Sequence, residues 1–336
     1  VESDDMAMQK TGIDMMSDSG RLAPDQLGRH YYSSGQIAYQ MDDSAGARAR
    51  FQQALEAGYE ADLQNVIAST YFEQDAHKEG IEYYRGVINA EIAAGRTPRE
   101  DWILRAFSAA YNNDLAREAI EFAAMNTQYH PSETNWRNAI AVQRNYVDMQ
   151  DDVLLDLMRL AYRTGIMQDD RDYADYIEAA DPRKLPNEVK MLIDEAISKG
   201  IFNASDPFVS ESRSTAAGLI KADRADLPSL ERDARAASAT ALAASSAGDV
   251  FLNFGESAKA EEMYAIAATK SGADLNRVMT RMGIAQFDQG KFAAAAETFG
   301  KVGGSRKAVG NLWQSFAQGK AAPTAPAVEA PDEATT

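Results

Sequence analysis

The chain contains no cysteine, which excludes disulfide bonds, thiolate metal sites and a cysteine nucleophile. Histidine is scarce as well. His30, His77 and His130 are the only three, and none has a second histidine or a glutamate at the spacing of a zinc site. We interpret all three as helix-end or packing residues. Proline accounts for 10 of 336 residues, a low share that favours helix over strand.

Signatures of catalysis and of membrane insertion are missing too. The sequence has no G-x-S-x-G elbow, no phosphate-binding G-x-x-x-x-G-K-[ST] loop and no G-x-G-x-x-G turn. It also lacks a run of about 18–20 apolar residues, the length needed to span a bilayer. We therefore expect a protein that is not an enzyme, carries no cofactor or metal and does not insert into a membrane.

The chain also has fewer basic than acidic residues. The chain has 51 acidic against 34 basic residues, a net charge of −17. An acidic surface repels nucleic acid and anionic lipid, so both are excluded as expected partners. The excess of acid serves solubility, and it also favours partners with basic segments.

What the sequence does contain is a repeat. Gly248 and Gly283 lie 35 residues apart, and each is followed by a second Gly after 7 residues and by an Ala after 12. Weaker copies of the pattern begin at Gly35, Ala68 and Ala106. Small residues at such intervals allow two helices of a hairpin to pack closely, and a fixed period of this length is typical of stacked helical hairpins.

Further helical patterns fill most of the remaining chain. We expect helices over 132–161, 169–180 and 185–199, and a closing helix over 305–318 that carries Trp313 and Phe316. Pro228 is expected to interrupt the helical pattern that resumes near residue 215.

These residues resemble the tetratricopeptide repeat, W-x-x-L-G-x-x-Y … A-x-x-x-F … P in about 34 residues. The resemblance covers about residues 28–131 and 241–304, with degenerate copies between, and Pro131 alone supplies the terminal proline. It implies an all-α fold, a right-handed α-solenoid of stacked helical hairpins. It also implies a concave face, lined by the first helix of each hairpin, along which peptides or proteins bind.

Placing the repeat on this chain names the residues of that groove. In the N-terminal part they are Tyr32, Gln36, Tyr39, Asn65, Ser69, Phe72, Glu73, Ser108, Tyr111 and Asn112, and in the C-terminal part Asp249, Asn253 and Asp288, with Ser245, Leu252, Thr280 and Phe287 beside them. One subclass of the family holds acidic tails with Lys, Asn and Arg at such positions. Bases are nearly absent here, so we expect a peptide with apolar or basic side chains instead.

The expected organisation has five parts. In order, they are a loosely ordered acidic arm over 1–20, an N-terminal solenoid over 21–200, a linker or irregular connection over 201–212, C-terminal repeats with a capping helix over 213–320, and a disordered Ala/Pro-rich tail over 321–336.

The acidic run over 168–175 suggests calcium at first sight. It lacks the central Gly and the closing Glu of an EF-hand loop, and its acids suit a solvated face or the start of a helix equally well. We therefore expect no metal there.

The sequence favours a non-catalytic scaffold that binds a peptide or protein partner. The alternative is a structural, self-associating or envelope-assembly and export subunit, in which Trp313 and Phe316 dock on a neighbour. The absent cysteine, the start at Val1 and the Ala/Pro-rich tail favour the periplasm of a bacterium, or secretion, over the cytoplasm without deciding between them.

Overall fold

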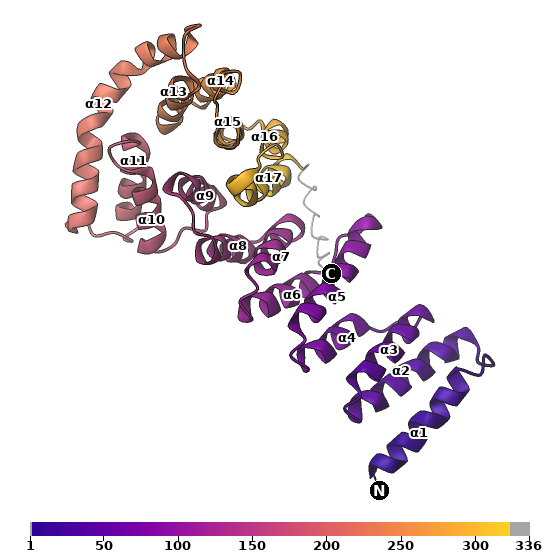
Figure 1. The fold of residues 1–336 in the computed structure, drawn as a ribbon. Helices are drawn as coiled ribbons and strands as arrows, with labels where there is room; N and C mark the ends of the chain where they lie inside the picture. The colour runs from indigo at the N-terminus through magenta and orange to yellow at the C-terminus, as the bar shows by residue number, and fades with distance from the viewer. Residues whose placement is uncertain (1, 323–336) are drawn as a thin grey trace, which may run out of the picture. The chain divides into compact units, whose positions relative to one another are not determined.

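The computed structural model describes the backbone of residues 2–322, which consists of α-helices joined by short loops (Figure 1). The all-α chain of stacked helical hairpins is therefore confirmed. Contacts divide the chain into two compact units, Val1–Tyr129 (unit 1) and His130–Thr336 (unit 2). No helix of the described range is both long and apolar enough to cross a bilayer. From residue 323 on, the expected tail lies outside the described residues.

Unit 1 is a linear stack, because its helices pack mainly against their neighbours in sequence. Its helices are α1 (Glu2–Ser17), α2 (Pro24–Gln40), α3 (Ser44–Glu56), α4 (Leu63–Phe72), α5 (His77–Ala93), α6 (Glu100–Asn112) and α7 (Ala116–Tyr129). The pairs α2/α3, α4/α5 and α6/α7 are the three hairpins predicted from Gly35, Ala68 and Ala106.

Unit 2 adds contacts between helices that are far apart in sequence: α9 packs on α17, and α11 on α13. Its elements are α8 (Glu133–Tyr146), α9 (Asp151–Thr164), α10 (Asp170–Ala180), α11 (Pro186–Ser198), α12 (Pro207–Arg235), α13 (Ala241–Asn253), α14 (Ser257–Ala268), α15 (Leu275–Asp288), α16 (Phe292–Phe299), the 3-10 turn η1 (Gly304–Arg306) and α17 (Lys307–Ala321). The two strong repeats are the hairpins α13/α14 and α15/α16.

Each strong repeat depends on contact between a glycine and an aromatic ring 16 residues later. A β-carbon placed on Gly283 would lie 2.6 Å from the Phe299 ring, and one placed on Gly248 would lie 2.6 Å from the Tyr264 ring. Real β-carbons almost never come within 3.0 Å of another heavy atom. Only glycine therefore fits where these helices cross. Because both hairpins need it at the same position, the repeat can be recognised in the sequence.

The turn inside each hairpin needs one residue in the left-handed conformation. Gly255 and Gly290 supply it in unit 2, with φ of 73° and 75°. In unit 1 the same turn uses Asp42, Asp75 and Asp114, with φ between 54° and 60°. Aspartate tolerates this conformation better than most side chains, so unit 1 keeps the turn without the glycine that marks it in sequence.

The N-terminal arm differs from the expectation, because residues Glu2–Ser17 form helix α1. Asp14 accepts hydrogen bonds from the Lys10 ammonium at 2.8 Å and from the Ser34 hydroxyl of α2 at 2.5 Å. Arg50 of α3 pairs with Asp14 and Asp18 at 3.0 Å. The helix is stabilised by contacts with the next hairpin, and the sequence of the arm alone gives no periodic signal of them.

Two expectations about residues 201–235 also differ from the structure. The irregular segment ends at Asp206, whose carboxylate caps α12 by accepting from the Phe208 N–H at 2.9 Å. Helix α12 then continues through Pro228, so the expected interruption there is wrong. An internal proline removes one backbone hydrogen bond, and the buried Leu227 and Ala234 hold the helix against the unit on either side of it.

Candidate functional site

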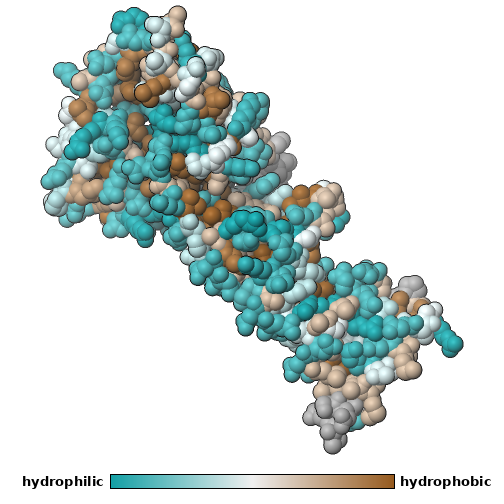
Figure 2. Space-filling model, viewed as in Figure 1, coloured by the Kyte–Doolittle hydropathy of each residue, from teal (hydrophilic) through white to brown (hydrophobic). Residues whose placement is uncertain are grey.

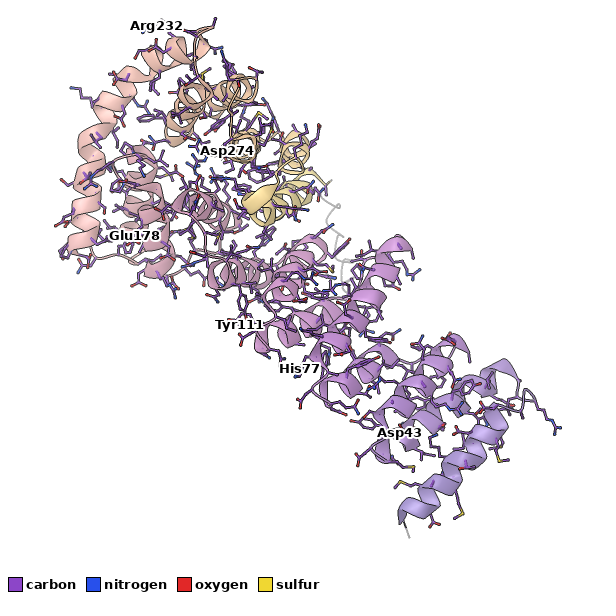
Figure 3. The ribbon with its side chains drawn as sticks, in the orientation of Figure 1. Asp43, His77, Tyr111, Glu178, Arg232 and Asp274 are labelled. Carbon is purple, nitrogen blue, oxygen red and sulfur yellow. The ribbon has the colours of Figure 1, made fainter. Side chains whose placement is uncertain are left out.

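Ten of the predicted groove residues belong to unit 1, and we refer to them as the unit 1 set. They lie on α2, α4 and α6, the first helices of three hairpins, with Glu73 directly after α4. None is buried: six are exposed and four are half-buried. Tyr39 and Tyr111 each keep 39% of their surface exposed, and Tyr111 is labelled in Figure 3. The set is therefore accessible.

Hydrogen bonds connect members of the unit 1 set across hairpins. The Tyr39 hydroxyl on α2 donates to Glu73 Oε1 at 2.5 Å, across 34 residues of chain. This bond, with smaller contributions from burial and the charge of Glu73, raises the pKa of Tyr39. Within α2, Gln36 Nε2 donates to the Tyr32 hydroxyl at 2.8 Å. The structure therefore brings together residues that the repeat pattern placed in two different hairpins.

Asn65 occupies a more internal place than the rest of the set. Its Oδ1 accepts from the Tyr84 hydroxyl at 2.8 Å, and its Nδ2 donates to Asp101 Oδ2 at 3.0 Å. One amide thus connects α4, α5 and α6. Asn65 supports the position of the other members, and its hydrogen-bonding groups are used within the chain.

A cavity of about 470 Å³ opens beside Phe72. Ser69, Phe72 and Ser108 of the unit 1 set line it together with Tyr84, Asp101, Leu104, Arg105 and Ala109. The predicted set missed Leu104 and Arg105. Both lie three or four residues before Ser108, so the helical period of α6 could have identified them.

The predicted groove residues of unit 2 are engaged by the chain itself. Asp249 accepts from the Tyr264 hydroxyl at 2.7 Å and from Arg281 Nη1 at 2.8 Å, and it also pairs with Arg277. Its side chain keeps only 15% of its surface exposed. The Asp249 carboxylate is therefore less accessible to a partner than the Glu73 carboxylate of unit 1, which is exposed.

The other two predicted residues of unit 2 contact α9 and α11. Both carboxylate oxygens of Asp288 accept from the Arg163 guanidinium of α9, each at 2.6 Å. Asn253 is 3% exposed, and its Oδ1 accepts from the backbone N–H of Glu188 at 2.9 Å. Residues expected to hold a partner thus hold helices of this unit.

The centre of these contacts is Asp156 of α9, which is fully buried. Its carboxylate accepts from Arg159 at 3.2 Å, from Arg281 of α15 at 3.2 Å and from Arg306 of η1 at 2.5 Å. Its backbone oxygen accepts from the indole N–H of Trp313 on α17 at 2.9 Å. We call the contacts of Asp156 with Arg159, Arg281, Arg306 and Trp313 the α9 clamp.

Charges around the clamp shift the acids toward ionisation. Burial alone would raise the pKa of Glu188, but the bidentate Arg159 guanidinium, 2.7–2.9 Å away, outweighs it and keeps that pKa below its usual value. Likewise, burial would raise the pKa of Asp249, yet Arg281 and Arg277 lower it. Both carboxylates are therefore charged in the folded protein at neutral pH.

Trp313 and Phe316 are not available to a neighbour in the way that the self-association alternative requires. Trp313 is fully buried and Phe316 is 8% exposed. Trp313 stacks on Phe299 with ring centroids 5.2 Å apart, and Phe316 meets Trp136 edge-on at 5.3 Å. The two rings complete the core of unit 2.

The acidic run over 168–175 begins a helix. Asp169 caps α10 by accepting from the Asp172 N–H at 2.9 Å, while Asp172 and Asp175 pair with Arg144 of α8. Throughout the described part of the chain, no group of three or more His, Asp or Glu side chains is arranged to hold a metal ion.

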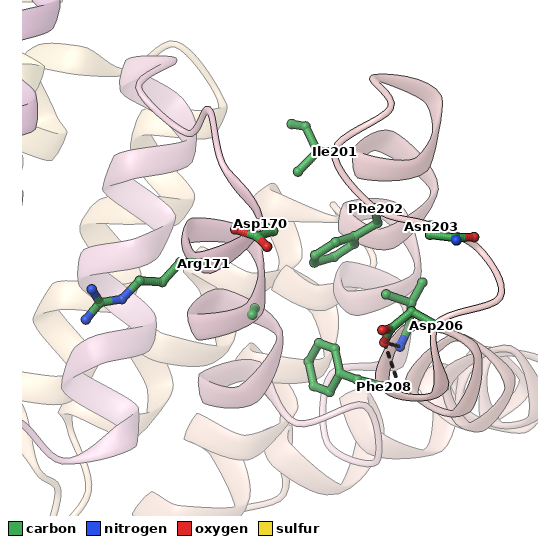
Figure 4. A pocket seen from close by; sticks show the side chains of 9 residues that line it. Asp170, Arg171, Ile201, Phe202, Asn203, Asp206 and Phe208 are labelled. Atoms are coloured by element: carbon green, nitrogen blue, oxygen red, sulfur yellow. Dashed lines mark hydrogen bonds between the residues drawn. The ribbon is translucent and has the colours of Figure 1, made fainter.

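A second cavity, of about 430 Å³, lies where α10, the 201–206 loop and the start of α12 meet (Figure 4). Phe202 and Phe208 form its aromatic walls, and Asp170 lies at its edge. Phe202 also packs edge-on against Tyr173, with centroids 6.0 Å apart. The sequence predicts a linker over 201–212 and gives no sign of a cavity there.

Elsewhere, the described surface carries a few large apolar side chains, of which Met8, Met15 and Met16 belong to α1. Met8, Met15 and Leu242 are the most exposed, at 67%, 72% and 71%. In the face drawn in Figure 2, hydrophilic residues cover most of the surface and hydrophobic residues form small patches. Small apolar patches of this kind are ordinary on soluble proteins and identify no site.

No family model matches this chain, and no curated protein matches it. Solved structures of tetratricopeptide repeat proteins do resemble it. The TPR2AB domain of yeast Sti1 in complex with pHSP90 is 13% identical with a TM-score of 0.29, over 88% of this chain and 94% of that one. A tetratricopeptide repeat protein from Parabacteroides merdae is 12% identical with a TM-score of 0.30, over 78% and 99%.

Yeast Tom70 is also similar, at 11% identity and a TM-score of 0.26, over 95% of this chain and 59% of Tom70. Scores this low carry no argument about a site or a partner. The assignment of the fold rests on the helices and on the glycine–aromatic contacts described above.

Proposed function

We propose that this protein is a non-catalytic scaffold that holds a partner polypeptide on the unit 1 set. One observation carries the proposal. Equivalent positions of the repeat are accessible in unit 1 and are engaged by α9 and α11 in unit 2. This difference supports a partner site on unit 1, whereas the contacts of the same positions in unit 2 stabilise the fold.

The chemistry of unit 1 supports a partner with apolar and basic side chains. The cavity beside Phe72 offers aromatic and aliphatic contact to an apolar side chain, with the Ser69 and Ser108 hydroxyls at its edge. The exposed Glu73 carboxylate offers a partner for a cation. Because the helices already hold these groups in place, less conformational entropy is lost when a partner binds.

The proposal is tested by site-specific photo-crosslinking of the full chain in its native cells. A benzoylphenylalanine at Gln36 or Ser108 is expected to capture a partner, which mass spectrometry identifies. The same residue at Glu178, an exposed position on α10 of unit 2 (Figure 3), serves as the control. Equal capture from Glu178 would count against a site on unit 1.

Substitution gives a second, independent measurement. Tyr39→Ala combined with Phe72→Ala is expected to abolish recovery of the crosslinked partner, because it removes one aromatic member of the set from α2 and one from α4. Since Phe72 also packs on Gly80, circular dichroism must show that the helices remain. Ser108→Arg, at an exposed position, blocks the cavity without removing core contacts. Unchanged recovery in both variants would reject the proposal.

A further inference from the structure

In unit 2, one of the predicted groove residues, Asp288, binds a helix of the same unit, α9. Gly283 and Ala68 occupy the same position in their hairpins, because each precedes by 16 residues an aromatic residue of the second helix, Phe299 and Tyr84. The Phe299 ring lies directly on Gly283. Ala68 and Tyr84 are both buried, at 0% and 1% exposure. Counting five residues onward gives two carboxylates in equivalent positions.

Those carboxylates are Asp288 and Glu73. Asp288 is the last residue of α15, and Glu73 directly follows α4. An acid at the C-terminal end of a helix is unfavourable, because the helix dipole places negative charge there, and a nearby cation reverses the effect. In unit 2 that cation is Arg163, which binds both oxygens of Asp288 at 2.6 Å.

Glu73 lies at the equivalent position, but the group that binds it is a neutral hydroxyl. Glu73 is exposed, and it accepts a hydrogen bond from the Tyr39 hydroxyl. A hydroxyl supplies a hydrogen bond without a charge, and Glu73 has no ion pair among the described residues. Arg48 of α3 binds the same end of α4, but through the Thr70 carbonyl at 3.1 Å rather than through this carboxylate.

Arg163 belongs to a helix, and this indicates that a helical partner can bind at the equivalent position in unit 1. Arg163 lies in the last turn of α9, a helix of 14 residues, where a cation is also favourable for its own helix. In unit 1, the residue next to Glu73 is Phe72, which lines the cavity of about 470 Å³. A helix that presents a cation to Glu73 can therefore place an apolar side chain from the same face in that cavity.

We propose that the partner of the unit 1 set binds as an amphipathic α-helix whose arginine pairs with Glu73, as Arg163 of α9 pairs with Asp288. This inference rests on the proposed function and adds to it the secondary structure of the partner and the residue that recognises it. The charge complementarity excludes an acidic segment, which would not reproduce the interaction seen at Asp288.

The probe for the test is a randomised library of peptides of about 18 residues, or five helical turns, displayed on phage and selected against the full chain. The selected peptides are expected to show apolar residues at a helical period with an arginine on the same face. Glu73→Gln is expected to weaken their binding about ten-fold, because a charge-assisted hydrogen-bonded pair is lost. Glu60→Gln, the same change at an exposed loop residue of unit 1, is expected to have no effect.

Two further measurements separate the possible outcomes. Replacing the peptide arginine by Gln is expected to reduce binding to the original chain and to have no additional effect on Glu73→Gln, as a double-mutant cycle requires of a direct pair. A proline in the middle of the peptide is expected to abolish binding, because it breaks the helix.

Peptides that tolerate the proline, or that bind Glu73→Gln and the original chain equally well, would overturn the helix inference. If Ser108→Arg still blocks such peptides, the proposed function stands without it. Peptides unaffected by Ser108→Arg and by Tyr39→Ala with Phe72→Ala would overturn both proposals.

Discussion

At the scale of single residues, the architecture depends on positions where no side chain fits. Gly248 and Gly283 let an aromatic ring lie directly on the helix backbone, and the rings of Tyr264 and Phe299 are almost fully buried there. Close-packed interiors cannot absorb even a methyl group without displacing neighbours. Such glycines are therefore fixed by packing rather than by backbone conformation.

Gly283→Val is expected to lower the free energy of unfolding by about 1–3 kcal/mol, because the new side chain must displace the Phe299 ring. Urea denaturation followed by circular dichroism measures the effect. Gly218→Ala in α12 is the matched control, since a β-carbon there meets nothing within 4 Å. It is expected to raise the free energy of unfolding by about 0.5–1 kcal/mol through helix propensity. An equal effect of both variants would contradict the role of close packing.

The same contacts explain which residues could be predicted from sequence. A small residue, Gly or Ala, 16 residues before an aromatic residue is visible without a structure, and it occurs in the three hairpins of unit 1 and in the two strong repeats of unit 2. The placement of Asp249 and Asn253 against the chain itself was not predictable in this way. Their partners, Arg281 and Glu188, lie 32 and 65 residues away, and no local pattern connects such residues.

At the scale of elements, α9 is the helix that distinguishes the two units. Its clamp joins it to α15, η1 and α17, and Arg159 joins it to Glu188 of α11. Buried ion pairs add little net stability compared with apolar packing, but breaking one leaves an uncompensated charge. The clamp therefore specifies where α9 lies more than it adds to the stability of the fold.

Asp156→Asn is expected to lower the free energy of unfolding by about 3–5 kcal/mol, because Arg281 and Arg306 both lose the buried Asp156 carboxylate that they share. Hydrogen exchange is expected to show the loss of protection in α9 and α17. Glu297→Gln, which removes a surface pair with Lys301, serves as the control and should leave the urea midpoint unchanged.

If Asp156→Asn does not fold, Asp156→Asn with Arg281→Met should restore part of the stability by removing a buried cation that has lost one of its two carboxylates. Normal stability of Asp156→Asn alone would show that the clamp does not hold α9.

Elements were harder to predict wherever their stability comes from distant contacts. Helix α1 shows no apolar period, yet it forms because Asp14 and Asp18 meet Arg50 of α3. Helix α12 contains a proline that ordinarily ends a helix, yet it continues because buried residues hold it on both sides of Pro228. In both cases tertiary contacts overrule the local preference of the sequence.

At the scale of the whole molecule, unit 2 is expected to lose stability in acid. Glu188 and Asp249 have a pKa in the folded protein below their ordinary values of 4.5 and 3.8. Their contribution to stability is therefore fully present above those values and is lost as the pH falls through the lower values of the folded state. Unit 2, which contains both, should weaken steeply below about pH 4.

Tryptophan fluorescence can follow unit 2 alone. The chain has three tryptophans, and Trp102→Phe leaves Trp136 and Trp313, both in unit 2. The urea midpoint of this variant is expected to be constant near neutral pH and to fall as the pH drops below the ordinary values of 4.5 and 3.8 toward the lower values of the folded state. Glu188→Gln should flatten part of that fall. A midpoint independent of pH over the same range would contradict the assigned charges.

The α9 clamp also has a consequence for the order in which the chain folds. Hydrogen bonds of unit 1 such as Tyr39 to Glu73 close after 34 residues, so its hairpins can form as they leave the ribosome. The bond from Trp313 to Asp156 closes after 157 residues. At about 5–20 residues per second, α9 waits roughly 8–30 seconds for the helix that completes its surroundings. During synthesis, then, unit 1 is the early-folding part of the chain, and α9 is the segment most in need of protection from aggregation.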